Sequence, residues 1–236
     1  MSKTDDMPEW ERVLWAAAHL QRIIPDAVLV GGTASAVHAN HRLSRDADHV
    51  LTDLRSRFDR VLAELESVAG WKTARINRPV QNLGSLDGIE TGVRQLIRQE
   101  PLETVQIDHH GQMITLPTEP EMLRIKAALI LKRNATRDYL DFVAMAVRLG
   151  DARVADALTR FDELYPQPNG ESALQQLLIQ LADARPFDLE KTTLSQYKSL
   201  NPEWHDWDRV KGVLSATGVN LFETLARKGS DQRRDG

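Results

Sequence analysis

The 236-residue sequence contains no cysteine, which excludes disulfide bonds, cysteine-ligated zinc and thiol catalysis. It also has little excess charge, because 30 basic and 34 acidic side chains give a formal net charge of −4. The chain as a whole is therefore not drawn to nucleic acid or anionic membranes. The first residues, MSKTDDMPEW, lack the apolar run of a signal peptide, and no stretch approaches the ~20 apolar residues of a membrane span. We therefore expect a cytoplasmic protein without a membrane segment.

The apolar content is sufficient for a hydrophobic core. Apolar residues make up 42% of the chain, and the length fits one large domain or two small ones. Helical and strand patterns alternate in the first half, whereas only helical patterns follow it. We predict an α+β fold with a mixed sheet flanked by helices over residues 1–117, an all-helical domain over 118–228 and a disordered tail over 229–236.

The periodicity and capping residues also give element positions. We expect one helix that ends near Arg22 and another that ends near Leu131. Further helices are expected at Thr33–Asn40, Arg55–Ala69, Thr136–Leu149, Asp151–Leu164, Glu171–Ala184, Glu203–Ala216 and Asn220–Arg227. Strands are expected at Ala27–Val30, around Asp46–Asp48, and at Trp71–Ile76, Thr91–Ile97 and Leu102–Asp108, with Asn82–Gly88 as a loop.

The stretch Leu29–Leu51 carries the strongest chemical signal. A short apolar run ends in Gly31-Gly32, a helix opens at Thr33, and a second strand presents Asp46 and Asp48. Residues two apart on a strand point to the same side, so these aspartates share one face. Two carboxylates that close repel each other unless a cation lies between them, and Mg²⁺ prefers such oxygen ligands.

The glycines fit an anionic ligand at the same place. Glycine has no Cβ, so backbone can approach a ligand closely, and the N–H groups at a helix N-terminus favour phosphate. A Gly-Gly turn or an Asp-x-Asp pair alone is common in proteins without such a role. The two together, separated by one helix, predict a site for a metal ion and a triphosphate.

This pattern resembles the nucleotidyltransferase superfamily, whose motif is Gly-Gly or Gly-Ser followed by Asp-x-Asp. More narrowly, it is similar to the AbiEii-type nucleotidyltransferase toxins of type IV toxin–antitoxin systems. A second segment, Leu123–Asp141 (LRIKAALILKRNATRDYLD), resembles that family's helix with a lysine followed by Arg-Asp-x-x-Asp. The resemblance covers roughly residues 27–149.

The resemblance implies a nucleotidyltransferase-like sheet domain and a set of site residues. Mg²⁺ or Mn²⁺ would bind Asp46, Asp48 and, as third carboxylate, Asp108, while Lys126 would supply compensating positive charge in catalysis. The nucleotide-binding residues would be Gly31, Gly32, Thr33, Arg45, Lys126, Arg137 and Asp138.

Several assignments remain open on the sequence alone. Asp108 is either the third carboxylate or a turn residue, and in another strand register Gln106 would occupy its position. Arg45 could reach a triphosphate or pair with an acid, and Asp141 fits a structural role better than a catalytic one. His49 departs from the apolar residue expected beside Asp-x-Asp. The histidines His38, His41, His49, His109 and His110 lack the spacing of a zinc motif.

The functional hypothesis is transfer of a nucleoside monophosphate from a nucleoside triphosphate to an acceptor hydroxyl. The resemblance implies a toxin-like enzyme that acts on RNA and has an antitoxin partner. One alternative is a non-catalytic nucleotide-binding or interaction protein that keeps the fold. Another is transfer to a small molecule, as in antibiotic-modifying relatives.

Overall fold

The computed structural model describes residues 7–232, and backbone contacts divide the chain into two compact units. The first unit comprises the chain up to Val37 and Leu43–Thr118. The second comprises His38–Arg42 and the chain from Glu119 onward. The short segment His38–Arg42 thus joins the helical unit, although it precedes the Asp-x-Asp pair in sequence.

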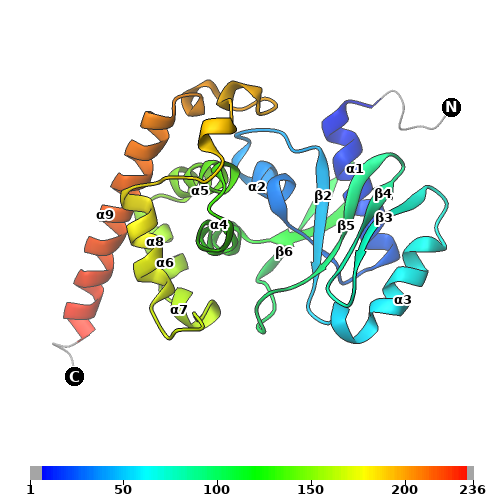
Figure 1. The fold of residues 1–236 in the computed structure, drawn as a ribbon, viewed down its shortest axis with the longest axis horizontal. Coiled ribbons are helices and arrows are strands. Elements are labelled where there is room, and N and C mark those ends of the chain that lie inside the picture. Colours follow the sequence, from blue (N-terminus) through cyan, green and yellow to red (C-terminus); the bar gives the residue numbers. More distant parts are fainter. Residues whose placement is uncertain (1–6, 233–236) are drawn as a thin grey trace. The chain divides into compact units, whose positions relative to one another are not determined.

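The first unit alternates helices and strands (Figure 1). Its elements are α1 (Glu9–Ile23), β1 (Val28–Leu29), α2 (Gly31–Ala39), β2 (Asp46–Leu51), α3 (Leu54–Glu66), β3 (Trp71–Asn77), β4 (Gln81–Leu86), β5 (Ile89–Gln95), β6 (Thr104–His109) and β7 (Gln112–Pro117), the last residues of α2 belonging to the second unit.

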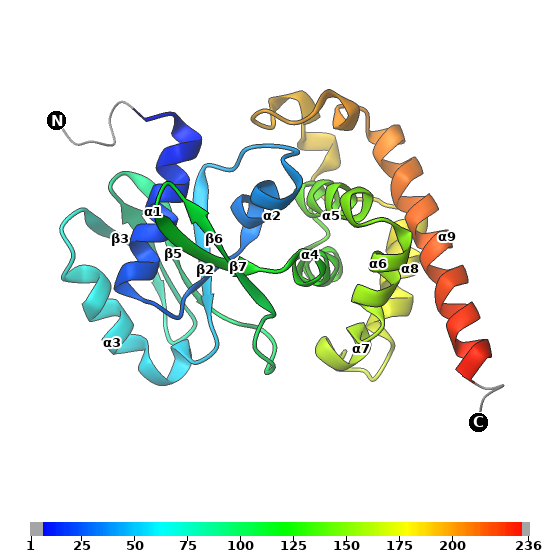
Figure 2. The same cartoon turned by 180° about the vertical axis from the view of Figure 1, so that it is seen from behind.

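Five of these strands form one mixed sheet in the order β1-β2-β5-β4-β3. β2 and β5 are parallel, whereas the other neighbours are antiparallel. β6 and β7 form a separate two-stranded sheet, which Figure 2 displays from behind. The predicted loop Asn82–Gly88 was wrong, because β4 occupies most of it and only Asp87 and Gly88 form the turn, with positive φ.

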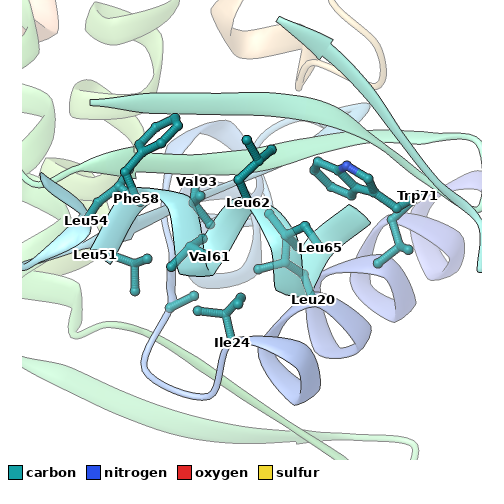
Figure 3. Packing of buried hydrophobic residues seen from close by; sticks show 12 residues of the cluster. Leu20, Ile24, Leu51, Leu54, Phe58, Val61, Leu62, Leu65, Trp71 and Val93 are labelled. Carbon is teal, nitrogen blue, oxygen red and sulfur yellow. The ribbon is translucent and has the colours of Figure 1, made fainter. Parts of the chain in front are cut away.

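The core of the first unit lies on one face of the five-stranded sheet. Apolar side chains of α1 and α3 pack there against inward residues of the strands (Figure 3). The buried cluster consists of Leu20, Ile24, Ala27, Leu51, Leu54, Phe58, Val61, Leu62, Leu65, Trp71, Leu86 and Val93. Since strand side chains alternate between faces, the residues between these point to the opposite face.

The second unit is all helical, as predicted. It contains α4 (Glu119–Arg133), α5 (Thr136–Leu149), α6 (Asp151–Leu158), α7 (Phe161–Leu164), α8 (Ala173–Ala182), the 3₁₀ turns Leu189–Lys191, Leu194–Gln196 and Pro202–Trp204, and α9 (Trp207–Gln232). The fold class is therefore confirmed as α+β, with a mixed sheet, flanking helices and a helical C-terminal region.

The last helix differs from the expected pattern. α9 is one helix, where the sequence suggested two helices separated near Thr217 and Gly218. It continues to Gln232, and thus into the segment 229–236 that we expected to be a tail; residues 233–236 lie outside the described residues. Within residues 7–232, no helix combines the length and apolarity that crossing a membrane requires.

Candidate functional site

Strand pairing places the two aspartates on the face of the sheet opposite the core. Asp46 pairs with Glu90 of β5 and Asp48 pairs with Gly92, while the intervening Ala47 is fully buried. Paired residues on parallel neighbours point to the same side, so Asp46, Asp48 and Glu90 share this face. Asp46 and Asp48 are half-buried and Glu90 is exposed.

The glycine corner lies against one of these carboxylates. Gly31 has φ +75°, and a Cβ built on it would lie 3.5 Å from Oδ2 of Asp48. The backbone N–H of the preceding Val30 donates to the carbonyl oxygen of Asp48, at 2.8 Å. The structure thus brings the corner and the Asp-x-Asp strand together, and helix α2 begins at Gly31 itself.

Thr33 holds this arrangement from inside. Its side chain is fully buried, and its hydroxyl donates to the carbonyl oxygen of Asp46 at 2.5 Å. The hydroxyl therefore ties the first turn of α2 to the start of β2. Gly31 and Gly32 open the helix, where N–H groups lack acceptors within the helix itself. These N–H groups make the corner suitable for an anion.

Both aspartates have polar partners at this face. Asp46 accepts a hydrogen bond from the hydroxyl of Ser44, at 2.5 Å. Arg94 lies 3.6 Å from Asp48, and both side chains are partly exposed, at 44% and 30% respectively. A pair of this kind contributes only about 0–1 kcal/mol, so a cation could displace the arginine.

The structure does not bring Asp108 to this face. Asp108 and Gln106 both lie on β6, outside the five-stranded sheet. The carboxylate of Asp108 accepts the N–H of Gly111, at 3.2 Å, as a turn residue does. The acid beside Asp46 in register is instead Glu90, which sequence reasoning missed because its strand gives no acidic motif.

The carboxylates of the sheet face are not preassembled around one point. In the described part of the chain, Asp46, Asp48 and Glu90 do not bring three ligand oxygens within 4.8 Å of one another. All three side chains reach solvent at least in part. Gly92, which is opposite Asp48, carries no side chain, and Leu83 packs closely against it.

A cationic row lies on the same face at the far edge of the sheet. Lys72 on β3 faces Ser85, which in turn pairs with Glu90, and Arg75 faces Leu83, which pairs with Gly92. Both cations are exposed, and neither forms an ion pair within the described residues. With strands about 4.8 Å apart, they lie about 14 Å from the aspartates across the sheet.

In the second unit, Lys126 belongs to a buried ionic cluster. Its ammonium is 2.7 Å from Asp141 and 3.9 Å from Asp138, and the lysine is only 1% exposed. Arg42 binds Asp141 with two nitrogens, at 2.7 and 3.0 Å, and His41 Nε2 lies 2.8 Å from the same carboxylate. Side chains from two segments, His41–Arg42 and α4, thus converge on Asp141 of α5.

The charges around Asp141 decide its ionisation. Burial alone would raise its pKa, but the positive charges of Arg42 and Lys126 and the hydrogen bond with His41 outweigh that effect. They hold the pKa of Asp141 well below its usual value, so the carboxylate is ionised at neutral pH. Asp141 is therefore the ionised centre of this cluster.

The remaining predicted site residues lie as follows. Asp138 is fully buried and binds Arg133 through both carboxylate oxygens. Arg137 is exposed. Arg45 is 76% exposed and lies 3.5 Å from Glu9, so it pairs with an acid in the first unit.

His49 lies on the core face of β2. It is completely buried, and neither ring nitrogen has a hydrogen-bond partner among the described residues. Desolvation lowers its pKa to about 4, although nearby backbone groups of Ala47, Ala17 and Gly92 oppose the shift. His49 is therefore neutral at pH 7, and it replaces an apolar residue without changing the face that carries the aspartates.

The fold matches known nucleotidyltransferase structures. A protein from H. pylori assigned as a nucleotidyltransferase aligns over 96% of this chain and 98% of its own, with a TM-score of 0.52 and 14% identity. MenT4, a nucleotidyltransferase toxin from Mycobacterium tuberculosis H37Rv, aligns over 93% of this chain and 87% of its own, with a TM-score of 0.51 and 16% identity. At these identities the likeness concerns the fold.

Sequence similarity points to a different group of proteins. The chain is 27% identical over 192 residues to the heme uptake protein MmpL11 of Mycobacterium tuberculosis H37Rv, which covers 75% of this chain and 20% of that protein. It is 28% identical over 129 residues to the mycolic acid-containing lipids exporter MmpL11 of Mycolicibacterium smegmatis, over 53% of this chain and 13% of that protein. The chain thus spans a fifth or less of the length of these relatives. No protein-family model matches it.

Proposed function

We propose that this chain is a metal-dependent nucleotidyltransferase, which moves a nucleoside monophosphate from a nucleoside triphosphate to an acceptor hydroxyl. The observation that supports it best is that Gly31 lies beside Asp48 on the face that also carries Asp46 and Glu90. A helix N-terminus that suits a phosphate and a set of carboxylates meet there.

The donor set suits a divalent cation of the Mg²⁺ or Mn²⁺ class. Asp46, Asp48 and Glu90 offer only carboxylate oxygens, which such hard cations prefer. A Cβ at Gly31 would fill the space beside Asp48 through which a phosphate oxygen can approach. A cation bound there would neutralise charge on the triphosphate and polarise its α-phosphate.

The residues of the first unit then have distinct roles. The N–H groups of Gly31 and Gly32 bind phosphate oxygens, and Thr33 fixes the corner through its bond to Asp46. The acceptor hydroxyl oxygen attacks the α-phosphorus, a new P–O ester bond forms, and the bond to the bridging oxygen breaks so that pyrophosphate leaves. A carboxylate of the sheet face takes the hydroxyl proton.

Lys126, Arg137, Asp138 and Arg45 remain predicted nucleotide-binding residues. Within the second unit, the charge of Lys126 is opposed by Asp141, which gives it a structural role in addition. Asp108 remains a prediction as third ligand, and its turn position makes Glu90 the better candidate.

For the acceptor we propose RNA. The unpaired cations Lys72 and Arg75 share the open face with the carboxylates, and a row of exposed cations suits a phosphate backbone. Likeness in fold to a nucleotidyltransferase toxin also supports a toxin-like role, of AbiEii type, with an antitoxin protein as partner.

The test is a transfer assay with the full chain. Each of the four labelled nucleoside triphosphates is incubated with Mg²⁺ and either total RNA or a metabolite extract. We expect one nucleotide to label RNA, with loss of transfer in Asp46→Asn and Asp48→Asn. Asp59→Asn removes an exposed carboxylate from α3 and is the matched control, which should retain wild-type transfer.

The possible outcomes separate the hypotheses. Label in the metabolite extract would favour a small-molecule acceptor. If no acceptor is labelled, and calorimetry detects triphosphate binding that persists in both aspartate variants and without metal, the chain is a non-catalytic nucleotide-binding protein. Full transfer by Asp48→Asn would contradict the role of the carboxylate pair.

A further inference from the structure

A second group of metal-ligating side chains lies away from the carboxylates of the sheet face. Within residues 7–232, Glu11, His109 and His110 form the one group of three whose ligand atoms all lie within 4.8 Å of one another. His109 Nε2 is 2.7 Å and His110 Nε2 is 3.3 Å from the same oxygen, Oε2 of Glu11. All three residues belong to the first unit.

The hairpin turn explains why neighbouring histidines point the same way. Consecutive residues of a strand face opposite sides, but the β6–β7 hairpin turns at His110 and Gly111, which have φ of 51° and 78°. Positive φ at both central residues defines the tight two-residue hairpin turn. The turn brings the two imidazole rings edge to face at 4.6 Å, and Asp108 holds it by accepting the N–H of Gly111.

Spacing of the ligand atoms fits a small cation after a limited adjustment. Bonds of about 2.0–2.1 Å from Zn²⁺ to nitrogen and oxygen give ligand atoms about 3.3–3.4 Å apart in a tetrahedral site. His110 is already at 3.3 Å from Glu11. His109 Nε2 is 2.7 Å from Glu11 Oε2 and must move about 0.6 Å farther from it. The hydrogen bond between them is then replaced by bonds to the metal ion.

We propose that Glu11, His109 and His110 bind a divalent transition-metal ion of the Zn²⁺ class, as three ligands that leave a coordination position open. Two imidazoles and one carboxylate are ligands of Zn²⁺, whereas Mg²⁺ prefers oxygen alone. The site is therefore selective against the cation proposed for the sheet face. A bound ion cross-links the tip of the hairpin to helix α1 and stabilises the first unit, because it binds the folded state.

This proposal does not rest on the proposed transferase activity. The simpler alternative is that His109 and Glu11 form a hydrogen-bonded pair that needs no metal, as His19 and Asp87 do at 3.2 Å. That second pair also joins α1 to a turn of the first unit, but it offers two ligands instead of three. His19→Gln is for this reason a matched control.

The experiment is calorimetric titration of the tag-free full chain, freed of metal with a chelator, with ZnCl₂ in excess Mg²⁺. We expect saturable binding of one ion per chain and a thermal midpoint that rises with Zn²⁺ concentration. Glu11→Gln and the double variant His109→Gln/His110→Gln should lower the affinity at least about tenfold and abolish the thermal shift. Circular dichroism verifies that each variant is folded.

Two variants separate this site from other histidines and from the carboxylate pair. His19→Gln and Asp46→Asn/Asp48→Asn should bind Zn²⁺ as the wild type does. Absence of saturable binding, or undiminished binding in the folded Glu11 and histidine variants, would overturn the proposal. Loss of the site in the aspartate variant would overturn it as well, since the ion would then lie on the sheet face.

Discussion

Replacing Asp141 by asparagine tests the buried cluster of the second unit. Asp141 is fully buried, and its carboxylate lies 2.7–3.0 Å from nitrogens of Arg42, His41 and Lys126. Asparagine has nearly the same shape but no negative charge. The substitution therefore leaves two buried cations without their main counter-charge, and it should destabilise the protein.

The structure sets the expected size of this loss. Removing one partner of a buried ion pair costs about 3–5 kcal/mol, because the other charge stays buried. The lower end applies here, since Lys126 keeps Asp138 at 3.9 Å. A loss of about 3 kcal/mol is a large fraction of the ~5–15 kcal/mol by which a typical protein is stable.

Urea denaturation of the purified variant measures the loss, with Asp183→Asn as control. Asp183 also pairs with two cations, Arg185 at 2.6 Å and Lys211 at 3.2 Å, but its side chain is 49% exposed. Solvent screens exposed pairs, so the control should lose much less stability than Asp141→Asn. Equal losses in the two variants would refute the argument that burial makes the Asp141 cluster essential.

The stability that Asp141 contributes should also depend on pH. The folded-state pKa of Asp141 is depressed by Arg42 and Lys126 against the opposing effect of burial. Its carboxylate therefore stabilises the fold above the pKa of unfolded aspartate, about 3.9, and this contribution is lost as the pH falls through the folded-state pKa. The stability difference between wild type and Asp141→Asn should therefore shrink progressively as the pH falls below about 4.

Two further substitutions test individual sites of the first unit. His49 has a pKa of about 4 in the folded protein and a reference value of 6.5, so the protein takes up a proton on unfolding between these pH values. Acidification from about pH 7 to 5 should therefore lower the free energy of unfolding by about 2 kcal/mol. Urea denaturation of His49→Leu should lack this pH dependence. Gly31→Ala places a side chain at φ +75° and should cost about 1–2 kcal/mol in thermal unfolding and weaken triphosphate binding, whereas Gly212→Ala, in open space on α9, should be neutral or stabilising.

The elements that sequence predicted well are those whose signal is local. The stripe of α3 and the alternation around Asp46 and Asp48 arise from residues near each other in the chain. β4 was missed because its sequence, QNLGSL, has few residues typical of strands. The segment forms a strand because it pairs with β3 on one side and β5 on the other. β7 was missed as well, since no expected element covered it.

The sites divide in the same way. The position of Gly31 beside Asp48 was expected from motif spacing, whereas Glu90 reaches the same face only through strand register. Asp141 binds Arg42, which is 99 residues away in sequence, and a periodic sequence pattern cannot predict such a distant partner. Glu11 likewise meets His109 across 98 residues, which is why the histidines offered no zinc motif in sequence.

The two-residue alternation of β2 makes the chain sensitive to length as well as to composition. A single residue inserted or deleted ahead of Asp46 would shift the strand by one step and turn every side chain to the other side. Both carboxylates would then point into the hydrophobic core, and Ala47 and His49 would be exposed to solvent. In natural or engineered variants, an insertion or deletion in this segment should therefore be more damaging than most single substitutions.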